Sequence, residues 1–173
     1  MKKILLIAVM TSLAFLQSLS AKEVTTVDYV DVNRYLGTWY DIASYPQWFQ
    51  KGCTNTRALY QLKHNGDLKV TNSCNKDSVT GKEKVSVGKA KIVDQETNSK
   101  LKVSFFGPFY GKYWIIDLDP NYQYAVVSDP KRSTLWILSR TPKMDEEVLA
   151  GIFERLKEQE YDLSKLLFTA HSY

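Results

Sequence analysis

Few side chains in this sequence are suited to catalysis or metal binding. The 173 residues include two histidines, His64 and His171, and two cysteines, Cys53 and Cys74. No spacing of His, Cys and Asp matches a metal site, no glycine-rich loop suits a phosphate, and no nucleophile has a neighbouring base. The sequence therefore predicts a protein that is not an enzyme, without catalytic residues, metal or cofactor.

Two carboxylates need an explanation because they fall on inward-facing positions of predicted strands. These are Asp41 and Asp117. A buried carboxylate is costly unless it is hydrogen-bonded or paired. We expect both to lie near strand ends, satisfied by tyrosine hydroxyls, Arg140 or backbone groups. A catalytic pair is the alternative.

The two cysteines are expected to form a Cys53–Cys74 disulfide, because two cysteines in an oxidising compartment usually pair. A two-residue turn at Asn65-Gly66 would place Cys53 opposite Ser78. Cys74 would then be about 13 Å away along a straight strand, which is too far to bridge. The disulfide thus requires the chain near Cys53 to leave the strand, and two separate thiols are the alternative.

The N-terminus has the pattern of a secretory signal peptide. Lys2-Lys3 precede an apolar run over residues 4–16, which is followed by small residues. The run is too short to remain as a membrane-spanning anchor, which is the alternative interpretation. We therefore expect a signal peptide over residues 1–21 and one domain over residues 22–173.

The end of this leader also bears on membrane attachment. Leu19-Ser20-Ala21 resembles the start of a bacterial lipoprotein box, but Lys22 stands where that box has its cysteine. No thiol is available there to carry a lipid. We expect a soluble periplasmic or secreted protein without a lipid anchor, for which transient membrane contact is still allowed.

Charge gives no indication of nucleic-acid binding. Without Lys2 and Lys3, 21 basic residues stand against 19 acidic ones, a difference of +2. No basic run alternates with aromatic residues. Aromatic residues make up 13% of the chain, which favours β-structure.

Alternation of apolar and polar residues predicts an all-β fold. Short turns connect eight strands, expected over residues 39–45, 54–63, 68–74, 84–93, 100–106, 113–119, 122–128 and 133–140. Such a meander closes naturally into an antiparallel up-and-down β-barrel, whereas a β-sandwich needs longer crossovers. An amphipathic α-helix over residues 144–160 is expected outside the barrel, before a last short strand over 166–170.

Three separated motifs resemble those of the lipocalin family. They are Gly37-Thr38-Trp39, the segment 122–129 and Leu138-Ser139-Arg140. The segments 102–111 and 135–142 are most similar to bacterial outer-membrane lipocalins and to apolipoprotein D. The resemblance implies that Arg140 lies against the ring of Trp39 at the closed end of the barrel. A guanidinium on a Trp face is favourable on physical grounds as well, so we expect this pair to be structural.

The inward strand faces define the expected ligand-binding wall. The residues predicted to bind ligand are Ala43, Ala58, Tyr60, Val70, Gly88, Val103, Phe105, Tyr113, Ile115, Val127, Trp136 and Leu138. Small residues facing aromatic ones leave room for a long apolar ligand, although the lining alone also allows a filled core. The family resemblance favours an open calyx.

The resemblance implies binding, storage or transport of fatty acids, lysophospholipids or similar lipids by a monomer or homodimer. Two alternatives are a lipid-modifying enzyme of the lipocalin type and a secreted module that binds another protein. Turnover of a bound lipid would identify the enzyme, and an occupied, exchangeable cavity would distinguish transport from protein interaction.

Overall fold

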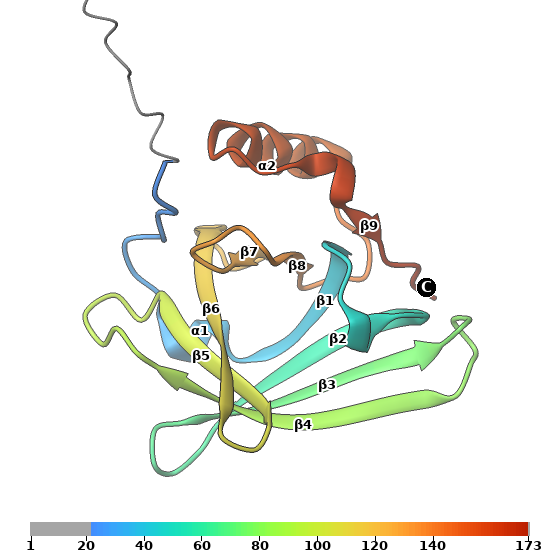
Figure 1. Cartoon of the computed structure of the whole chain (residues 1–173), viewed down its shortest axis with the longest axis horizontal. Coiled ribbons are helices and arrows are strands. Elements are labelled where there is room, and N and C mark those ends of the chain that lie inside the picture. The colour runs from blue at the N-terminus through green and yellow to red at the C-terminus, as the bar shows by residue number, and fades with distance from the viewer. Residues whose placement is uncertain (1–21, 173) are drawn as a thin grey trace, which may run out of the picture.

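The chain forms a barrel of antiparallel strands with one helix against its outside (Figure 1). The computed structural model describes residues 22–172, so the predicted signal peptide lies outside the described residues. The elements are α1 (Val32–Tyr35), β1 (Gly37–Ser44), the 3-10 turn η1 (Trp48–Gln50), β2 (Cys53–Leu62), β3 (Leu68–Lys76), β4 (Glu83–Ile92), β5 (Lys100–Phe106), β6 (Phe109–Leu118), β7 (Tyr124–Ser128), β8 (Leu135–Ser139), α2 (Glu146–Glu158), the 3-10 turn η2 (Leu163–Lys165) and β9 (Leu167–Phe168).

The predicted eight-stranded barrel is confirmed. Each strand from β2 to β8 pairs with its neighbour in the chain, and β1 closes the ring by pairing with both β8 and β2. Trp39 of β1 lies opposite Ala58 of β2, for example. Closure gives each of the eight strands a hydrogen-bonded neighbour on both sides over a part of its length. The turns at the end near η1 form the open end, and α1 lies at the other, closed end (Figure 1).

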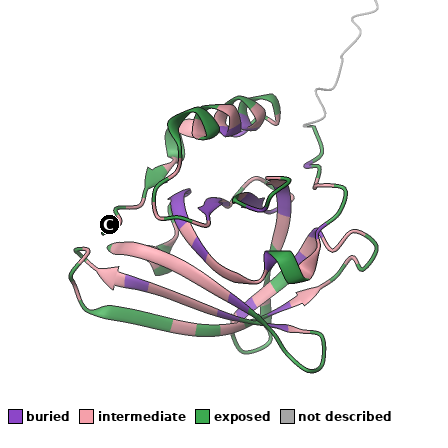
Figure 2. Ribbon diagram, turned by 180° about the vertical axis from the view of Figure 1, so that it is seen from behind, coloured by how far each residue is buried: buried purple, intermediate pink, exposed green. Residues whose placement is uncertain are grey.

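Two hydrophobic clusters divide the molecule. An inner cluster fills the closed half of the barrel and includes Trp39, Leu68 and Ile115. An outer cluster lies between the barrel and α2 and includes Ile137 and Ile152. Burial is therefore concentrated in β1, β7 and β8, because both faces of these strands are covered, one by the inner and one by the outer cluster. The side of α2 that faces away from the barrel is exposed (Figure 2).

Asp145 caps the N-terminal end of helix α2. The side chain of Asp145 accepts hydrogen bonds from the backbone N–H groups of Glu147 and Val148, at 2.8 and 3.2 Å. This satisfies donors that have no partner inside the helix. The helix then buries Ile152 and Leu156 against the barrel, as its apolar stripe predicts.

Two irregularities in the ladders correct the predicted facing of two residues. The pairing of β1 with β8 shifts between Asp41 and Ala43, and that of β6 with β7 shifts between Ile115 and Asp117. An extra residue in one strand inverts the facing of everything beyond it. Ala43 therefore packs in the outer cluster and Asp117 bonds Arg155 of α2, so the inward placement of both was wrong.

The β2–β3 hairpin explains how the predicted Cys53–Cys74 disulfide forms. The turn has three residues, since Lys63 pairs with Asp67, and a bulge near Asn55 shifts the register again. Cys53 consequently lies opposite Lys76, and its Cα is 5.4 Å from that of Cys74. The disulfide is confirmed, but the expectation that Cys53 must leave the strand was wrong, because the two-residue turn assumed for it is not the one adopted.

A shorter turn than predicted joins β5 to β6. Phe106 pairs directly with Phe109, so only Gly107 and Pro108 lie between the strands. Gly107 has a φ of +55°, a conformation in which glycine avoids the strain of a side chain. Residues 109–112, which lie between the strands expected over 100–106 and 113–119, therefore belong to β6, and Phe109 and Tyr110 lie at the tip of a hairpin.

The C-terminal segment seals the gap where β2 diverges from β1. β9 pairs with Ala43 and Ser44 of β1, and Asn55 of β2 donates its N–H to the carbonyl of Ala170 at 2.8 Å. The Nε2 of His171 lies 2.8 Å from the backbone oxygen of Asp41. The last strand is thus an additional edge to the barrel near its open end.

Candidate functional site

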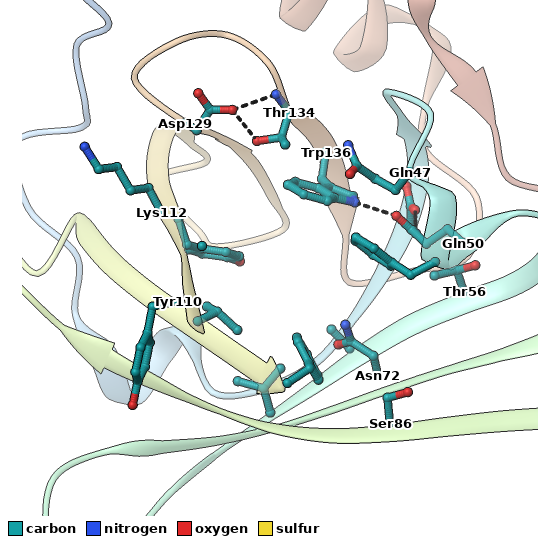
Figure 3. Close-up of a pocket in the computed structure, with 18 of the residues that line it drawn as sticks. Gln47, Gln50, Thr56, Asn72, Ser86, Tyr110, Lys112, Asp129, Thr134 and Trp136 are labelled. Atoms are coloured by element: carbon teal, nitrogen blue, oxygen red, sulfur yellow. Dashed lines mark hydrogen bonds between the residues drawn. The ribbon is translucent and has the colours of Figure 1, made fainter. Parts of the chain in front are cut away.

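A cavity of about 640 Å³ lies inside the barrel and opens at the end that carries η1. Its walls come from strands β1 to β6 and β8, and its mouth from η1, the β5–β6 turn and the β7–β8 loop. Figure 3 shows Trp136 and Gln50 on one side of this space and Tyr110 and Lys112 on the other. This volume is within the range of small-molecule binding sites, about 300–1,000 Å³.

Most of the predicted wall is found where the alternation of the strands places it. Eight of the twelve residues predicted to bind ligand line the cavity: Ala58, Tyr60, Val70, Val103, Phe105, Tyr113, Trp136 and Leu138. They come from five strands, β2, β3, β5, β6 and β8, and apart from the hydroxyls of the tyrosines and the N–H of the indole they are apolar. The sequence pattern therefore placed most of its predicted residues in the wall, where they are eight of the 28 residues that line the cavity.

The other four residues lie elsewhere, for three physical reasons. Ala43 faces the outer cluster because of the bulge in β1. Gly88 is a close contact between strands: a Cβ there would lie 2.5 Å from the backbone oxygen of Ser104 and 2.7 Å from the ring of Phe105. Ile115 and Val127 are fully buried in the inner cluster and pack inside the barrel without lining the cavity.

The floor of the cavity is Trp39, held from below by Arg140. The ring is fully buried, and its Nε1–H donates to the backbone oxygen of Tyr35 at 2.8 Å. The guanidinium carbon of Arg140 lies 3.7 Å from the ring centroid, so the two groups meet as the resemblance implied. Arg140 also donates to the backbone oxygens of Thr38, Arg34 and Tyr122 at 2.9, 2.6 and 3.2 Å.

Three tyrosine hydroxyls form a network beside this floor. Tyr60 donates to the hydroxyl of Tyr113 at 2.9 Å, and Tyr35 lies 2.8 Å from the same oxygen. Burial raises the pKa of Tyr60 to about 12 and raises those of Tyr35 and Tyr113 well above the usual value. All three therefore remain neutral at physiological pH, and Tyr60 and Tyr113 supply polar groups to the deep end of the cavity.

Asp41 lies on the wall near the mouth and is 3% exposed. Its Oδ2 accepts hydrogen bonds from Gln50 at 2.9 Å and Ser44 at 3.1 Å, while Oδ1 is buried without a partner among the described residues. Burial raises the pKa of Asp41 to about 7, against the lowering effect of the two hydrogen bonds. The expectation that Tyr, Arg140 or backbone groups satisfy this carboxylate was wrong, since η1 and β1 supply its partners.

Gln50 connects η1 to the cavity wall on two sides. Its amide nitrogen donates to Asp41, and its amide oxygen accepts from the Nε1–H of Trp136 at 3.0 Å. Figure 3 shows this second bond across the mouth of the cavity. The segment that covers part of the opening is therefore fixed by side chains inside it.

Asp117 lies outside the barrel, so it is not a partner of Asp41. Its Oδ2 accepts from the Nε of Arg155 at 2.8 Å, and the other side of the guanidinium donates to the Tyr124 hydroxyl at 2.9 Å. The pair joins α2 to β6 and β7. A catalytic pair of carboxylates is thereby excluded, because the barrel wall separates the two groups.

Several polar residues of the cavity are absent from the set predicted to bind ligand. Thr56 and Asn72 fall on the inward faces that alternation predicts for their strands, and Ser86 follows the same alternation in β4. Gln50 and Thr134 come from loops, and no periodic signal identifies such residues. Their placement depends on how the loops fold across the open end.

Neither metal binding nor membrane-spanning helices are evident in the part of the chain that the structure describes. Among residues 22–172, no three His, Cys, Asp or Glu side chains lie close enough together to hold a metal ion. In the same range, no helix is both long and apolar enough to cross a bilayer.

Comparison of the sequence with known families gives one match across nearly all of the described residues. The profile of the Lipocalin-like domain matches residues 30–171. The chain is 43% identical over 146 residues to the outer membrane lipoprotein Blc of Escherichia coli K12, covering 84% of this chain and 81% of that protein. It is 41% identical over 159 residues to temperature-induced lipocalin-1 of Arabidopsis thaliana, covering 87% and 84%.

More distant proteins agree with this match. Apolipoprotein D of Rattus norvegicus is 31% identical over 144 residues, covering 79% of this chain and 74% of that protein. Among solved structures, insecticyanin of the tobacco hornworm Manduca sexta superposes with a TM-score of 0.71 at 21% identity, covering 88% and 87% of the two chains. That likeness concerns the fold alone. On its motifs, its barrel and its sequence matches, the chain belongs to the lipocalin family.

Proposed function

We propose that this protein binds and carries an amphiphile with a long acyl chain, such as a fatty acid or a lysophospholipid. The observation that carries the proposal is the cavity of about 640 Å³, which has largely apolar walls and one open end. Proteins of this family generally bind small hydrophobic ligands in the barrel. Burial of an acyl chain is worth about 0.8 kcal/mol per CH₂ before the cost of ordering the chain.

The proposed orientation places the acyl chain inside and the head group at the mouth. Trp136 is the largest predicted wall residue on its strand, and its ring should contact the chain. The polar side chains near the opening, including Gln50, Thr134 and Lys112, suit a head group. At the deep end, the neutral tyrosine hydroxyls tolerate a chain terminus because they already bond one another.

Tryptophan fluorescence tests this proposal directly. Delipidated protein should give a saturable change in emission when titrated with fatty acids and lysophospholipids. Trp136→Phe should remove much of the change, whereas Trp114→Phe should not, because Trp114 packs in the outer cluster. If no acyl ligand gave a saturable response, the protein-interaction alternative would become the better explanation of this fold.

We also propose that the mature chain begins near Lys22 and is released without a lipid anchor. The support is the leader pattern and the lysine at the position where a lipoprotein box has its cysteine. The printed name of the Escherichia coli relative describes that protein as an outer membrane lipoprotein. Cell fractionation and intact-mass measurement of the mature N-terminus test the difference: an acylated N-terminus in the membrane fraction would contradict the proposal.

A further inference from the structure

The open end of the cavity carries four aromatic side chains that face solvent. These mouth aromatics are Trp48, Phe49, Phe106 and Phe109, with exposed fractions of 80, 37, 64 and 78%. All four also line the cavity, so they surround its opening. Exposed apolar groups gathered around one functional opening are unusual for a surface that meets only water.

The mouth aromatics form two separate projecting tips. Trp48 and Phe49 lie in η1, with ring centroids 5.6 Å apart and rings nearly perpendicular. Phe106 and Phe109 flank the two-residue turn between β5 and β6. Figure 3 shows Gln50, next to the first tip, and Tyr110, next to the second, on opposite sides of the cavity. A hollow between two tips is a poor shape for a continuous protein interface.

Lysine side chains lie beside both tips. The Nζ of Lys84 donates to the backbone oxygen of Phe49 at 3.2 Å. At the second tip, the Nζ atoms of Lys89 and Lys102 lie 5.5 and 5.1 Å from the ring centroid of Tyr110. Lys112 and Lys131 line the opening itself. The charged groups nearest the aromatic tips are therefore largely cationic.

The carboxylates of the same region do not cancel this charge. Glu83 is paired with Arg57 at 2.6 Å. Burial raises the pKa of Asp129, but hydrogen bonds from Ser133 and Thr134 lower it by more, so this carboxylate stays ionised and offsets one lysine of the opening. Asp77 follows Lys76 in the β3–β4 turn, and Asp41 is buried on the cavity wall with a raised pKa. The lysines around the opening thus present a net positive surface to whatever approaches it.

We infer that the mouth aromatics and their lysines form a docking surface for an anionic phospholipid bilayer. Aromatic rings settle at the level of lipid head groups, and lysines are attracted to anionic lipids. Lysine is depleted in protein–protein interfaces, which makes a protein partner the weaker fit. Docking in this way turns the opening toward the membrane, so that a lipid passes between bilayer and cavity without crossing bulk water. The inference goes beyond the proposed function and does not depend on which lipid the cavity holds.

Flotation of delipidated protein with vesicles tests the docking surface. Binding should be strong to vesicles of phosphatidylglycerol and phosphatidylcholine, weaker to phosphatidylcholine alone, and should fall as salt rises. The double variant Trp48→Ala/Phe109→Ala should lower the partition coefficient by about tenfold or more. Lys84→Glu and Lys131→Glu should each lower it by about fivefold or more.

Matched variants elsewhere on the chain provide the controls. Tyr29→Ala/Val93→Ala removes two side chains of similar exposure, 59 and 61%, near the closed end, where the backbone N–H of Val30 donates to the backbone oxygen of Thr97 in the β4–β5 turn. Lys63→Glu and Lys143→Glu reverse exposed charges beyond the opposite end of the strands. None of these should change the partition coefficient by as much as the mouth variants. Quenching of Trp48 by brominated acyl chains, with Trp48→Phe as the blank, should show that the ring enters the bilayer.

Each other outcome would overturn the inference. These are no binding to anionic vesicles, equal losses in the mouth and control variants, or a mouth-dependent homodimer in sedimentation velocity without vesicle binding. The last would identify the face as an interface between two copies. Because no acyl ligand is present, failure here leaves the fluorescence titration of the cavity unaffected, and failure of that titration leaves vesicle binding to be measured independently.

Discussion

At the residue scale, Arg140 has a role that extends well beyond its contact with Trp39. Its guanidinium joins three backbone oxygens from α1, β1 and the β6–β7 loop beneath the indole ring. Burial lowers the pKa of Arg140, and no carboxylate among residues 22–172 forms an ion pair with it. A charge held by a π-face and three carbonyl dipoles is well satisfied, and here it joins α1, β1 and the β6–β7 loop at the closed end of the barrel.

Arg140→Ala should therefore lower the free energy of unfolding by about 1–3 kcal/mol, because it leaves three carbonyls and the Trp39 face without their partner. Chemical denaturation measures this. Arg57→Ala is the matched control, since the main contact it removes is a partly exposed ion pair with Glu83, which is worth about 0–1 kcal/mol. Arg140→Lys should recover a part of the loss, because an ammonium cannot reach all three oxygens at once. Equal stability of the alanine variant and the parent would contradict this role.

Asp41 makes stability depend on pH in a definite direction. Its pKa in the folded protein is about 7, against an ordinary value of 3.8, so folding favours the protonated form. The associated stability is fully present below about pH 4 and is lost as pH rises to about 7, a change of at most about 4 kcal/mol. Asp41→Asn should behave like the protonated acid, so its advantage over the parent should grow across this range.

Urea denaturation of the parent and Asp41→Asn between pH 4 and 8 gives this difference. The two proteins differ at this one side chain, so the difference between them isolates the contribution of Asp41. The cause is local: Oδ1 has no partner and Oδ2 has two neutral donors, which cannot compensate a buried negative charge. A difference that stays constant with pH would mean that water reaches the carboxylate in the folded state.

At the element scale, the alternation of side chains predicted most of the strands but could not locate the irregularities. The wall residues from Ala58 to Leu138 follow simple alternation, whereas Ala43 and Asp117 lie beyond bulges that no residue type marks. Gly88 was expected in the wall, but its role depends on the neighbouring Phe105, which the sequence of β4 cannot show. Gln50 was missed for the same reason, because its partners come from β1 and β8.

The disulfide shows how one turn changes the geometry of a whole hairpin. With three residues in the turn and a bulge near Asn55, Cys53 and Cys74 approach closely enough to bond while both strands remain paired. We expect the Cys53→Ala/Cys74→Ala variant to lose about 3 kcal/mol of stability, because the unfolded chain gains the freedom of a loop closed over a separation of 21 residues.

Intact-mass measurement with and without reductant, combined with alkylation, checks the bond itself, and denaturation of the double variant checks its energetic effect. Alkylation of both thiols in unreduced protein would contradict the bond. The fold should survive the substitution, since the barrel is held by ladders on both sides of β2 and β3.

At the scale of the whole molecule, the two hydrophobic clusters separate the outer face of the barrel, which holds α2, from the inner face, which encloses the cavity. The outer cluster and the Asp117–Arg155 pair fix α2 and leave the interior free. The inner cluster fills only the closed half, so the open half stays hollow above Trp39. Motif order predicted this architecture from the sequence, but the size of the cavity depends on how far the inner side chains extend, which the alternation does not contain.

Because the cavity is closed at one end, the binding affinity should depend on the length of the acyl chain. Each CH₂ that enters adds about 0.8 kcal/mol before ordering costs, so affinity should rise with acyl length until the chain reaches the floor at Trp39 and the tyrosines. Titration of the parent with saturated fatty acids of increasing length should give a plateau or a maximum. Trp136→Ala enlarges the wall and should move that maximum to longer or bulkier chains, whereas Trp114→Ala, on the outer side, should leave it unchanged. An affinity that rises with acyl length without reaching a plateau, or a length preference that is unchanged in Trp136→Ala, would indicate that the acyl chain binds outside the barrel.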